Sequence, residues 1–226
     1  MKRTLLLTAL AILTVTTAFA QREFYGRSVR LGFKIDPVFS NSLSPKENGI
    51  EKAGGTFGIN YGLMADIMFS DGRGAFATGV EVAHAGGKLK YTETGTGLHG
   101  PGEYRLKLQY LQIPLSVKLK TNPMESGMMF WGQFGTYMGA LLGSRLDYTG
   151  TSASGNQTNQ KILNQTNKLN MGLLLGAGIQ QPVADKTDLY IGLGFENGFT
   201  DITSNKNWND GKVNLNRWAL RLGVFF

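Results

Sequence analysis

Side-chain polarity alternates with a period of two residues along most of the chain after its first twenty residues. From Phe57 to Phe69 the odd positions are all apolar, and the even positions between them carry Gly, Asn, Met and Asp. Successive side chains of a β-strand point to opposite faces, so this pattern predicts strands and does not match a helix. The same alternation predicts eight strands, at 28–39, 56–69, 75–91, 103–120, 128–143, 169–181, 187–199 and 213–226.

Two of the predicted strands depart from a simple alternation. In 103–120 the apolar residues occupy even positions up to Tyr110 and odd positions from Leu111 onward. A slip of one residue predicts a β-bulge near Gln109–Leu111. In 128–143 one face holds Phe130, Phe134, Met138 and Leu142 and the other holds Trp131 and Tyr137. We predict a strand there and leave its orientation open.

The connections between the predicted strands alternate in length. Short ones lie at 70–74, 121–127 and 182–186, and long polar ones lie at 40–55, 92–102, 144–168 and 200–212. Short turns on one side and long loops on the other are typical of bacterial outer-membrane barrels. The strands also exceed the roughly 9–11 residues with which a tilted strand crosses a bilayer. We therefore predict an all-β fold, an eight-stranded antiparallel up-and-down transmembrane barrel with periplasmic turns, extracellular loops and periplasmic termini.

The first twenty residues have the three parts of a secretory signal. Met1–Arg3 is positive, Thr4–Thr17 is an apolar run, and Ala18–Ala20 offers a small-x-small cleavage site. We expect residues 1–20 to be a signal peptide and residues 21–226 to form the barrel domain. The expected location is the outer membrane of a Gram-negative bacterium. The chain has no cysteine, which excludes a disulfide scaffold, a thiolate metal site and a cysteine nucleophile.

The face opposite the apolar one distinguishes a membrane barrel from a soluble, lipocalin-like barrel with an apolar interior. This face consists mostly of Gly, Ala, Asn and Gln with few charges, and the chain contains 31 glycines. Glycine weakens a water-facing strand, whereas the lumen of an eight-stranded barrel has room only for packed side chains. We expect the apolar face to meet lipid and the charges to pair across the lumen. This predicted charge network contains Arg30, Lys34, Asp66, Glu81, Arg105, Glu196 and Arg221, with Asp36 and Lys107 on the same face.

Short segments carry a family resemblance. The C-terminal segment alternates and ends in Phe, which resembles the signal read by the barrel assembly machinery; its residues are Trp218, Leu220, Leu222, Val224 and Phe226. The segment Tyr110–Lys118, YLQIPLSVK, resembles the YLxIPL strand of the PorT-like outer-membrane β-barrel family. Phe76–Val80 with Gly87 and Lys88 resembles the third strand of that family. The resemblance implies an eight-stranded barrel, an assembly-machinery partner during biogenesis and a role associated with protein secretion.

Candidate catalytic residues are few. His99 lies in a long predicted loop near Glu93 and Glu103, and a His–carboxylate pair can act as a general base that activates water. The loop is rich in glycine, which gives poor support to placed catalytic groups. His84 is the other of the two histidines in the chain, and two histidines are too few for a usual zinc site. We expect no metal and no cofactor.

These features predict a non-enzymatic integral outer-membrane protein, a surface, assembly or secretion-associated component that acts through its extracellular loops. Loop 144–168 is the expected contact with a surface or secretion-system protein, with Ile162 and Leu163 as its apolar contact point. The alternative is a rim enzyme that acts on lipid or peptide through His99 and a carboxylate. The dispersed basic charges favour outer-membrane lipid and lipopolysaccharide as partners, and do not favour nucleic acid.

Overall fold

The computed structural model describes residues 29–46, 49–69, 72–150, 155–209 and 212–226. These residues form ten strands and one short helix. The strands are β1 (Val29–Pro45), β2 (Ile50–Gly54), β3 (Thr56–Phe69), β4 (Gly74–Tyr91), β5 (Gly102–Lys120), β6 (Met129–Gly150), β7 (Gln157–Lys161), β8 (Leu169–Ala184), β9 (Thr187–Gly198) and β10 (Val213–Phe225), and the helix is α2 (Asn205–Trp208).

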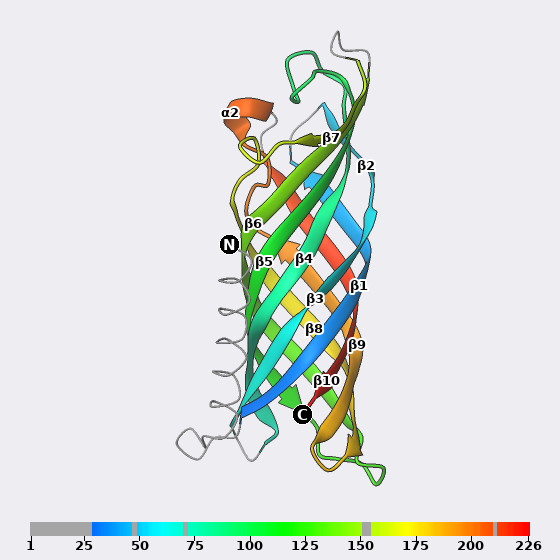
Figure 1. The fold of residues 1–226 in the computed structure, drawn as a ribbon, viewed down its shortest axis with the longest axis vertical. Coiled ribbons are helices and arrows are strands. Elements are labelled where there is room, and N and C mark those ends of the chain that lie inside the picture. The colour runs from blue at the N-terminus through cyan, green and yellow to red at the C-terminus, as the bar shows by residue number, and fades with distance from the viewer. Residues whose placement is uncertain (1–28, 47–48, 70–71, 151–154, 210–211) are drawn as a thin grey trace, which may run out of the picture.

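Eight of the strands close into an antiparallel barrel, which confirms the predicted fold. Around the barrel they run β1, β3, β4, β5, β6, β8, β9 and β10, and β10 pairs back onto β1. Phe33 of β1, for example, lies opposite Val224 of β10 and Leu63 of β3. Each of the eight strands is therefore hydrogen-bonded on both sides, as a lipid-exposed sheet requires. Figure 1 shows them tilted around one axis.

The strands extend beyond their predicted ends on the side of the long connections. β1 continues to Pro45 and β6 to Gly150, so parts of the predicted loops 40–55 and 144–168 are strand. Two short strands lie in the same connections, β2 paired with β4 and β7 paired with β6. The helix α2 lies at this same end in Figure 1. We call this end of the barrel, where the long connections lie, the outer end.

The predicted bulge in β5 is wrong. Even-numbered residues of β5 are buried along its whole length, from Tyr104 through Gln112 to Lys120. The irregularity lies in β6, where Gly143 and Leu141 are the partners of consecutive residues of β5 and Leu142 is the extra residue. The inward-facing positions of β5 therefore stay the same on both sides of Tyr110, and what changes there is which of its two faces carries the apolar residues. Towards the outer end its inner face is apolar and its outer face polar, and further down the outer face is apolar.

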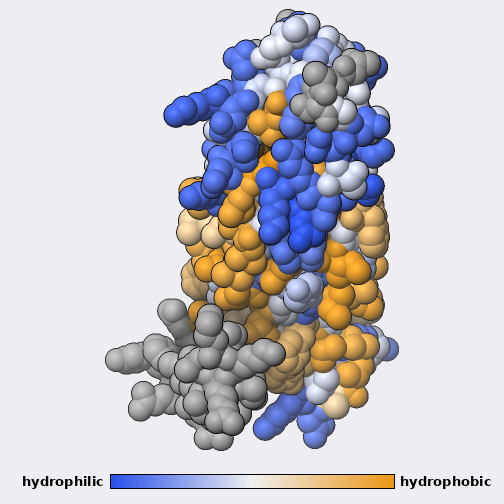
Figure 2. All heavy atoms as spheres, turned by 45° about the horizontal axis from the view of Figure 1, so that its top comes forward, coloured by the Kyte–Doolittle hydropathy of each residue, from blue (hydrophilic) through white to orange (hydrophobic). Residues whose placement is uncertain are grey.

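The apolar outer face forms a belt around the barrel. Exposed apolar side chains of this belt include Phe33, Ile35, Ile59, Leu63, Phe76, Val80, Ile113, Leu115, Leu175, Leu193 and Val224. On the face seen in Figure 2, hydrophobic residues lie in the middle of the molecule and hydrophilic residues lie above them. In β6 the residues Phe130, Phe134, Met138 and Leu142 are exposed, and Trp131 and Tyr137 point inward and are buried. The lipid-facing surface is thus the apolar one. Among the described residues, no helix is long and apolar enough to cross a membrane.

Candidate functional site in the lumen and the outer cap

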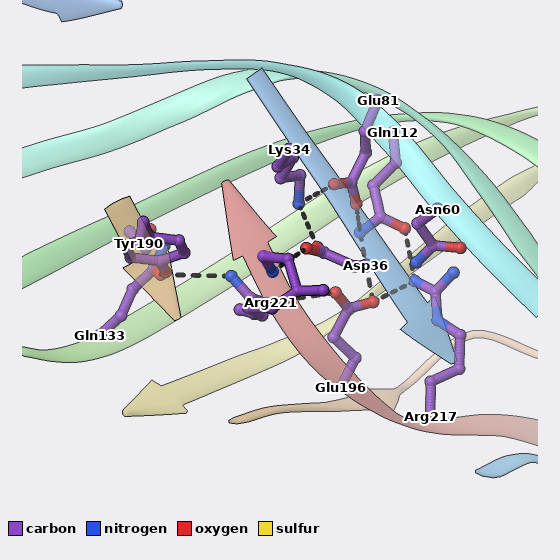
Figure 3. A network of polar contacts seen from close by, with 12 residues as sticks. Lys34, Asp36, Asn60, Glu81, Gln112, Gln133, Tyr190, Glu196, Arg217 and Arg221 are labelled. Atoms are coloured by element: carbon purple, nitrogen blue, oxygen red, sulfur yellow. Dashed lines mark hydrogen bonds and ion pairs between the residues drawn. The ribbon is translucent and has the colours of Figure 1, made fainter. Parts of the chain in front are cut away.

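A network of buried charges fills the lumen at the level of the belt (Figure 3). Glu196 of β9 forms an ion pair with Arg217 of β10, and its second carboxylate oxygen lies 3.6 Å from Nη2 of Arg221. Lys34 of β1 forms an ion pair with Glu81 of β4. The network joins strands from opposite sides of the barrel, because every strand directs alternate residues inward.

Amide side chains connect these ion pairs. Gln112 is completely buried, and its Nε2 donates to Oε1 of Glu81 at 2.7 Å and to Oε2 of Glu196 at 3.2 Å. Its Oε1 accepts a hydrogen bond from Arg217 at 2.5 Å. Gln133 accepts one from Nη1 of Arg221 at 3.3 Å. A buried charge is costly unless it is paired and hydrogen-bonded, so these amides stabilise the network.

A second group of charges surrounds Lys118. Its Nζ lies 2.6 Å from Oδ2 of Asp66, and both side chains are only 2% exposed. The same ammonium lies 4.7 Å from the ring centre of Tyr190 and 4.6 Å from that of Phe225, within range of cation–π attraction. The lumen is therefore closed by ion pairs and rings together.

Six of the seven residues predicted for the charge network point into the lumen: Arg30, Lys34, Asp66, Glu81, Glu196 and Arg221. Arg105 does not, because it is exposed on the outer face of β5, and Lys107 lies on that face as well. The assumed bulge had inverted the phase of this part of the strand. Lys118, Arg217 and Gln112 were missed, although the alternation of β5 and β10 continues through them.

The outer end of the barrel is filled by an apolar core that we call the outer cap. It consists of Leu43, Ile50, Leu89, Tyr91, Tyr104, Leu106, Tyr148, Ile162, Ile202, Trp208, Val213 and Leu215, all of them buried. The ring centres of Tyr91 and Tyr148 lie 4.8 Å from that of Tyr104, and the ring centre of Trp208 lies 5.5 Å from it. The Trp208 indole donates to the carbonyl oxygen of Gln165 at 2.7 Å. The long connections are thus folded against the barrel.

His99 packs against the rings of Tyr104 and Tyr148 of the outer cap and is not paired with a carboxylate among the described residues. Its backbone N–H donates to the hydroxyl of Tyr104 at 2.8 Å, and its Nε2 lies 2.8 Å from Oε1 of Gln160. The hydroxyl of Tyr104 in turn donates to the carbonyl oxygen of Gly100 at 2.7 Å. Of the predicted catalytic carboxylates, Glu103 forms an ion pair with Lys88 at 3.2 Å. The structure does not assemble the predicted His99–carboxylate pair.

Three further predictions concern single residues or clusters. Ile162 is completely buried in the outer cap, so only Leu163, which is 42% exposed, can serve as the predicted apolar contact. His84 lies on the outer face of β4, with its ring 6.2 Å from that of Tyr61. In the part of the chain that the structure describes, no three His, Cys, Asp or Glu side chains gather into a group that could hold a metal ion.

Comparison with known proteins identifies the family of the barrel. Residues 19–204 match the family described as outer membrane protein beta-barrel domain. Neisserial surface protein A is similar in structure, with a TM-score of 0.49 and 12% identity over 87% of this chain and 95% of that one. OprG from Pseudomonas aeruginosa gives a TM-score of 0.47 and 13% identity over 87% and 92% of the two chains. Ail of Yersinia pestis gives a TM-score of 0.38 and 13% identity over 88% of this chain and 97% of that one. No curated protein matches the sequence.

Proposed function

The chain belongs to the outer membrane protein beta-barrel domain family, and we propose that it is a non-enzymatic component of the cell surface that acts through its outer cap. Its location is the outer membrane of a Gram-negative bacterium. The observation that carries the proposal is the folding of the long connections into one apolar core at the outer end. Residues of these connections that are already packed into the core lose less conformational entropy when a partner binds.

The filled lumen supports a role at the surface over a role in transport. Eight strands leave room only for packed side chains, and here Lys118, Gln112 and Arg217 occupy the space at the level of the belt. Above them the rings of the outer cap fill the interior of the barrel at its outer end. A solute would have to displace paired charges and packed rings, so the outer surface remains as the place for interactions.

The partner that we propose is a surface protein or a component of a protein secretion system. The resemblance of Tyr110–Lys118 to the PorT-like strand supports the secretion-associated form of the proposal. The C-terminal residues Trp218–Phe226 are proposed to be read by the barrel assembly machinery, as their alternation and terminal Phe suggest. The alternative enzyme is not favoured, since His99 packs between rings and Gln160.

Site-directed photo-crosslinking in cells tests the proposal. Deleting loop 144–168 would remove part of β6, all of β7 and Ile162, so single exposed positions are better probes. A photo-crosslinking residue at Asn164 or Lys206, both exposed at the outer end, should give discrete protein adducts. The same residue at Leu115 in the belt, which is 46% exposed, should give none.

Two results would contradict the proposal. One is the absence of protein adducts from both outer positions in a strain in which deleting the gene impairs surface display or secretion. The other is a hydrolytic activity that His99→Ala abolishes while the variant retains the heat-dependent gel mobility of a folded barrel. The second result would establish the enzyme.

A further inference from the structure

Three cations lie side by side on the outer surface of the barrel near its outer end. Lys107 of β5 is the register partner of Arg145 of β6, and Arg145 is the register partner of Lys161 of β7. All three residues are exposed. Directly opposed residues of antiparallel strands have Cβ atoms about 4.5–5.5 Å apart, and like charges there are destabilising. An anion lying over the row would relieve this repulsion.

The row keeps an excess of positive charge. Asp147 is the carboxylate next to it, with Oδ2 2.5 Å from Nζ of Lys107. Neither Arg145 nor Lys161 forms an ion pair with any residue that the structure describes, and Arg105 adds a further cation as the register partner of Asp147. One carboxylate therefore faces four cations.

The row lies just above the apolar belt. Along β5 the next outward residues after Lys107 are Gln109 and then Leu111, where the belt begins at 39% exposure. On β6 the first exposed apolar residue below Arg145 is Leu142. Two residues of a strand span about 7 Å, so the cations lie within about 14 Å of the lipid-facing residues, at the level of the lipid headgroups.

A hollow of about 510 Å³ lies against this row on the outside of the barrel. Its lining combines the three cations with the polar side chains of His84 and Gln109 and the apolar side chains of Leu142 and Leu163. The hollow is open partly because Gly143 has no side chain. A Cβ atom at Gly143 would meet only Oε1 of Gln109, at 3.9 Å.

We propose that this hollow binds a phosphate group of an outer-leaflet glycolipid, lipopolysaccharide, with an acyl chain along Leu142 and Leu163. The planar guanidinium of Arg145 matches a phosphate bidentately, and Lys107 and Lys161 add point charges on either side. A lipid supplies both an anion, which fits the three cations of the hollow, and a hydrocarbon chain, which fits its apolar side chains. The inference depends on the location of the barrel in the outer membrane and is independent of the proposed protein partner.

Lipid binding to the purified full-length protein, measured by native mass spectrometry, tests this site. The probes are bis-phosphorylated lipid A and the same lipid after enzymatic removal of its phosphates. We expect the wild-type protein to bind the phosphorylated lipid at least about tenfold more tightly, a difference of about 1.4 kcal/mol. The double substitution Arg145→Gln with Lys161→Gln should abolish most of this preference.

The matched control removes the same charge elsewhere. Lys90→Gln with Lys206→Gln alters two exposed lysines that do not line the hollow, and should leave lipid A affinity within about twofold of wild type. Gly143→Trp fills the hollow without changing charge and should weaken binding about tenfold. Heat-dependent gel mobility shows that each variant is folded.

Three results would overturn the inference. Equal weakening by the control pair would mean that net charge alone attracts the lipid. Equal binding of the dephosphorylated lipid would mean that the acyl chains bind without the phosphate. Displacement of lipid A by millimolar inorganic phosphate alone would assign the hollow to a free anion.

Discussion

At the scale of single residues, burial decides how much an ion pair contributes to the stability of this barrel. Lys118 and Asp66 are each only 2% exposed, whereas Lys88 and Glu103 are 36% and 49% exposed at a comparable ion-pair distance. Water screens the exposed pair, and its contribution to stability is small. In the lumen the loss of one partner leaves a buried charge with no compensation.

Lys118→Met should therefore lower the free energy of unfolding by about 3–5 kcal/mol, because it leaves the carboxylate of Asp66 buried and unpaired. Lys88→Met should change it by less than about 1 kcal/mol. Urea unfolding in lipid vesicles, followed by heat-dependent gel mobility, measures both. Similar losses for the two variants would mean that the lumen is hydrated well enough to screen its charges.

At the scale of elements, the glycines of β8 and β9 make room for a side chain of β6. The Trp131 indole donates to the carbonyl oxygen of Ile179 at 3.1 Å and stacks on Tyr190 with ring centres 4.4 Å apart. A Cβ atom at Gly192 would lie 2.3 Å from Cζ2 of this indole, and one at Gly178 would lie 2.7 Å from it. The glycines on the inner face of β8 and β9 thus leave the space that the Trp131 indole occupies.

Gly192→Ala should consequently destabilise the barrel by about 1–3 kcal/mol through overpacking against Trp131. Gly132 of β6 is the matched control, because a Cβ atom there meets nothing within 4 Å. Gly132→Ala should stay within about 0.5 kcal/mol of wild type. The same urea titration compares them, and an equal cost for both would show that strand propensity, not packing, sets the glycine content.

The outer cap is a second element-scale unit, and Trp208 is completely buried in it. Trp208→Ala should cost about 3–5 kcal/mol locally, because it leaves a cavity among the rings of Tyr91 and Tyr104. Hydrogen exchange should then accelerate in residues 155–168 and 199–209, while the belt segments of β8, β9 and β10 keep their protection. Equal acceleration in those strands would show that the outer cap and the barrel unfold together.

The sequence alone was sufficient to locate the strands where they cross the bilayer, although it left the orientation of the strand at 128–143 open. There lipid on one side and a packed lumen on the other enforce the period of two, and the predicted ends of β3 and β4 agree with the structure within a residue. Above the bilayer the apolar residues change to the inner face, as at Tyr104, and this inversion produced the wrong bulge and the wrong side for Arg105. The short polar strand β7 carries no such alternation.

At the scale of the whole molecule, the described residues form three environments, of which two lie at the same level, inside and outside the barrel wall, and the third lies at the outer end. Paired charges fill the lumen, apolar side chains face lipid around it, and the outer cap closes the outer end. The sequence predicted the first two environments through residues such as Glu196 and Leu115. It did not predict the third, because the outer cap joins residues as distant as Leu43 and Trp208.

The most direct test of this arrangement uses the three tryptophans of the chain. Trp218 faces the belt and is 44% exposed, whereas Trp131 in the lumen and Trp208 in the outer cap are 3% and 0% exposed. Three variants that each keep one tryptophan, with the others changed to Phe, are reconstituted in phospholipids brominated on their acyl chains. We predict strong fluorescence quenching of Trp218 and weak quenching of Trp131 and Trp208. Strong quenching of Trp131 with protection of Trp218 would show that the apolar face points inward, and would contradict the membrane barrel.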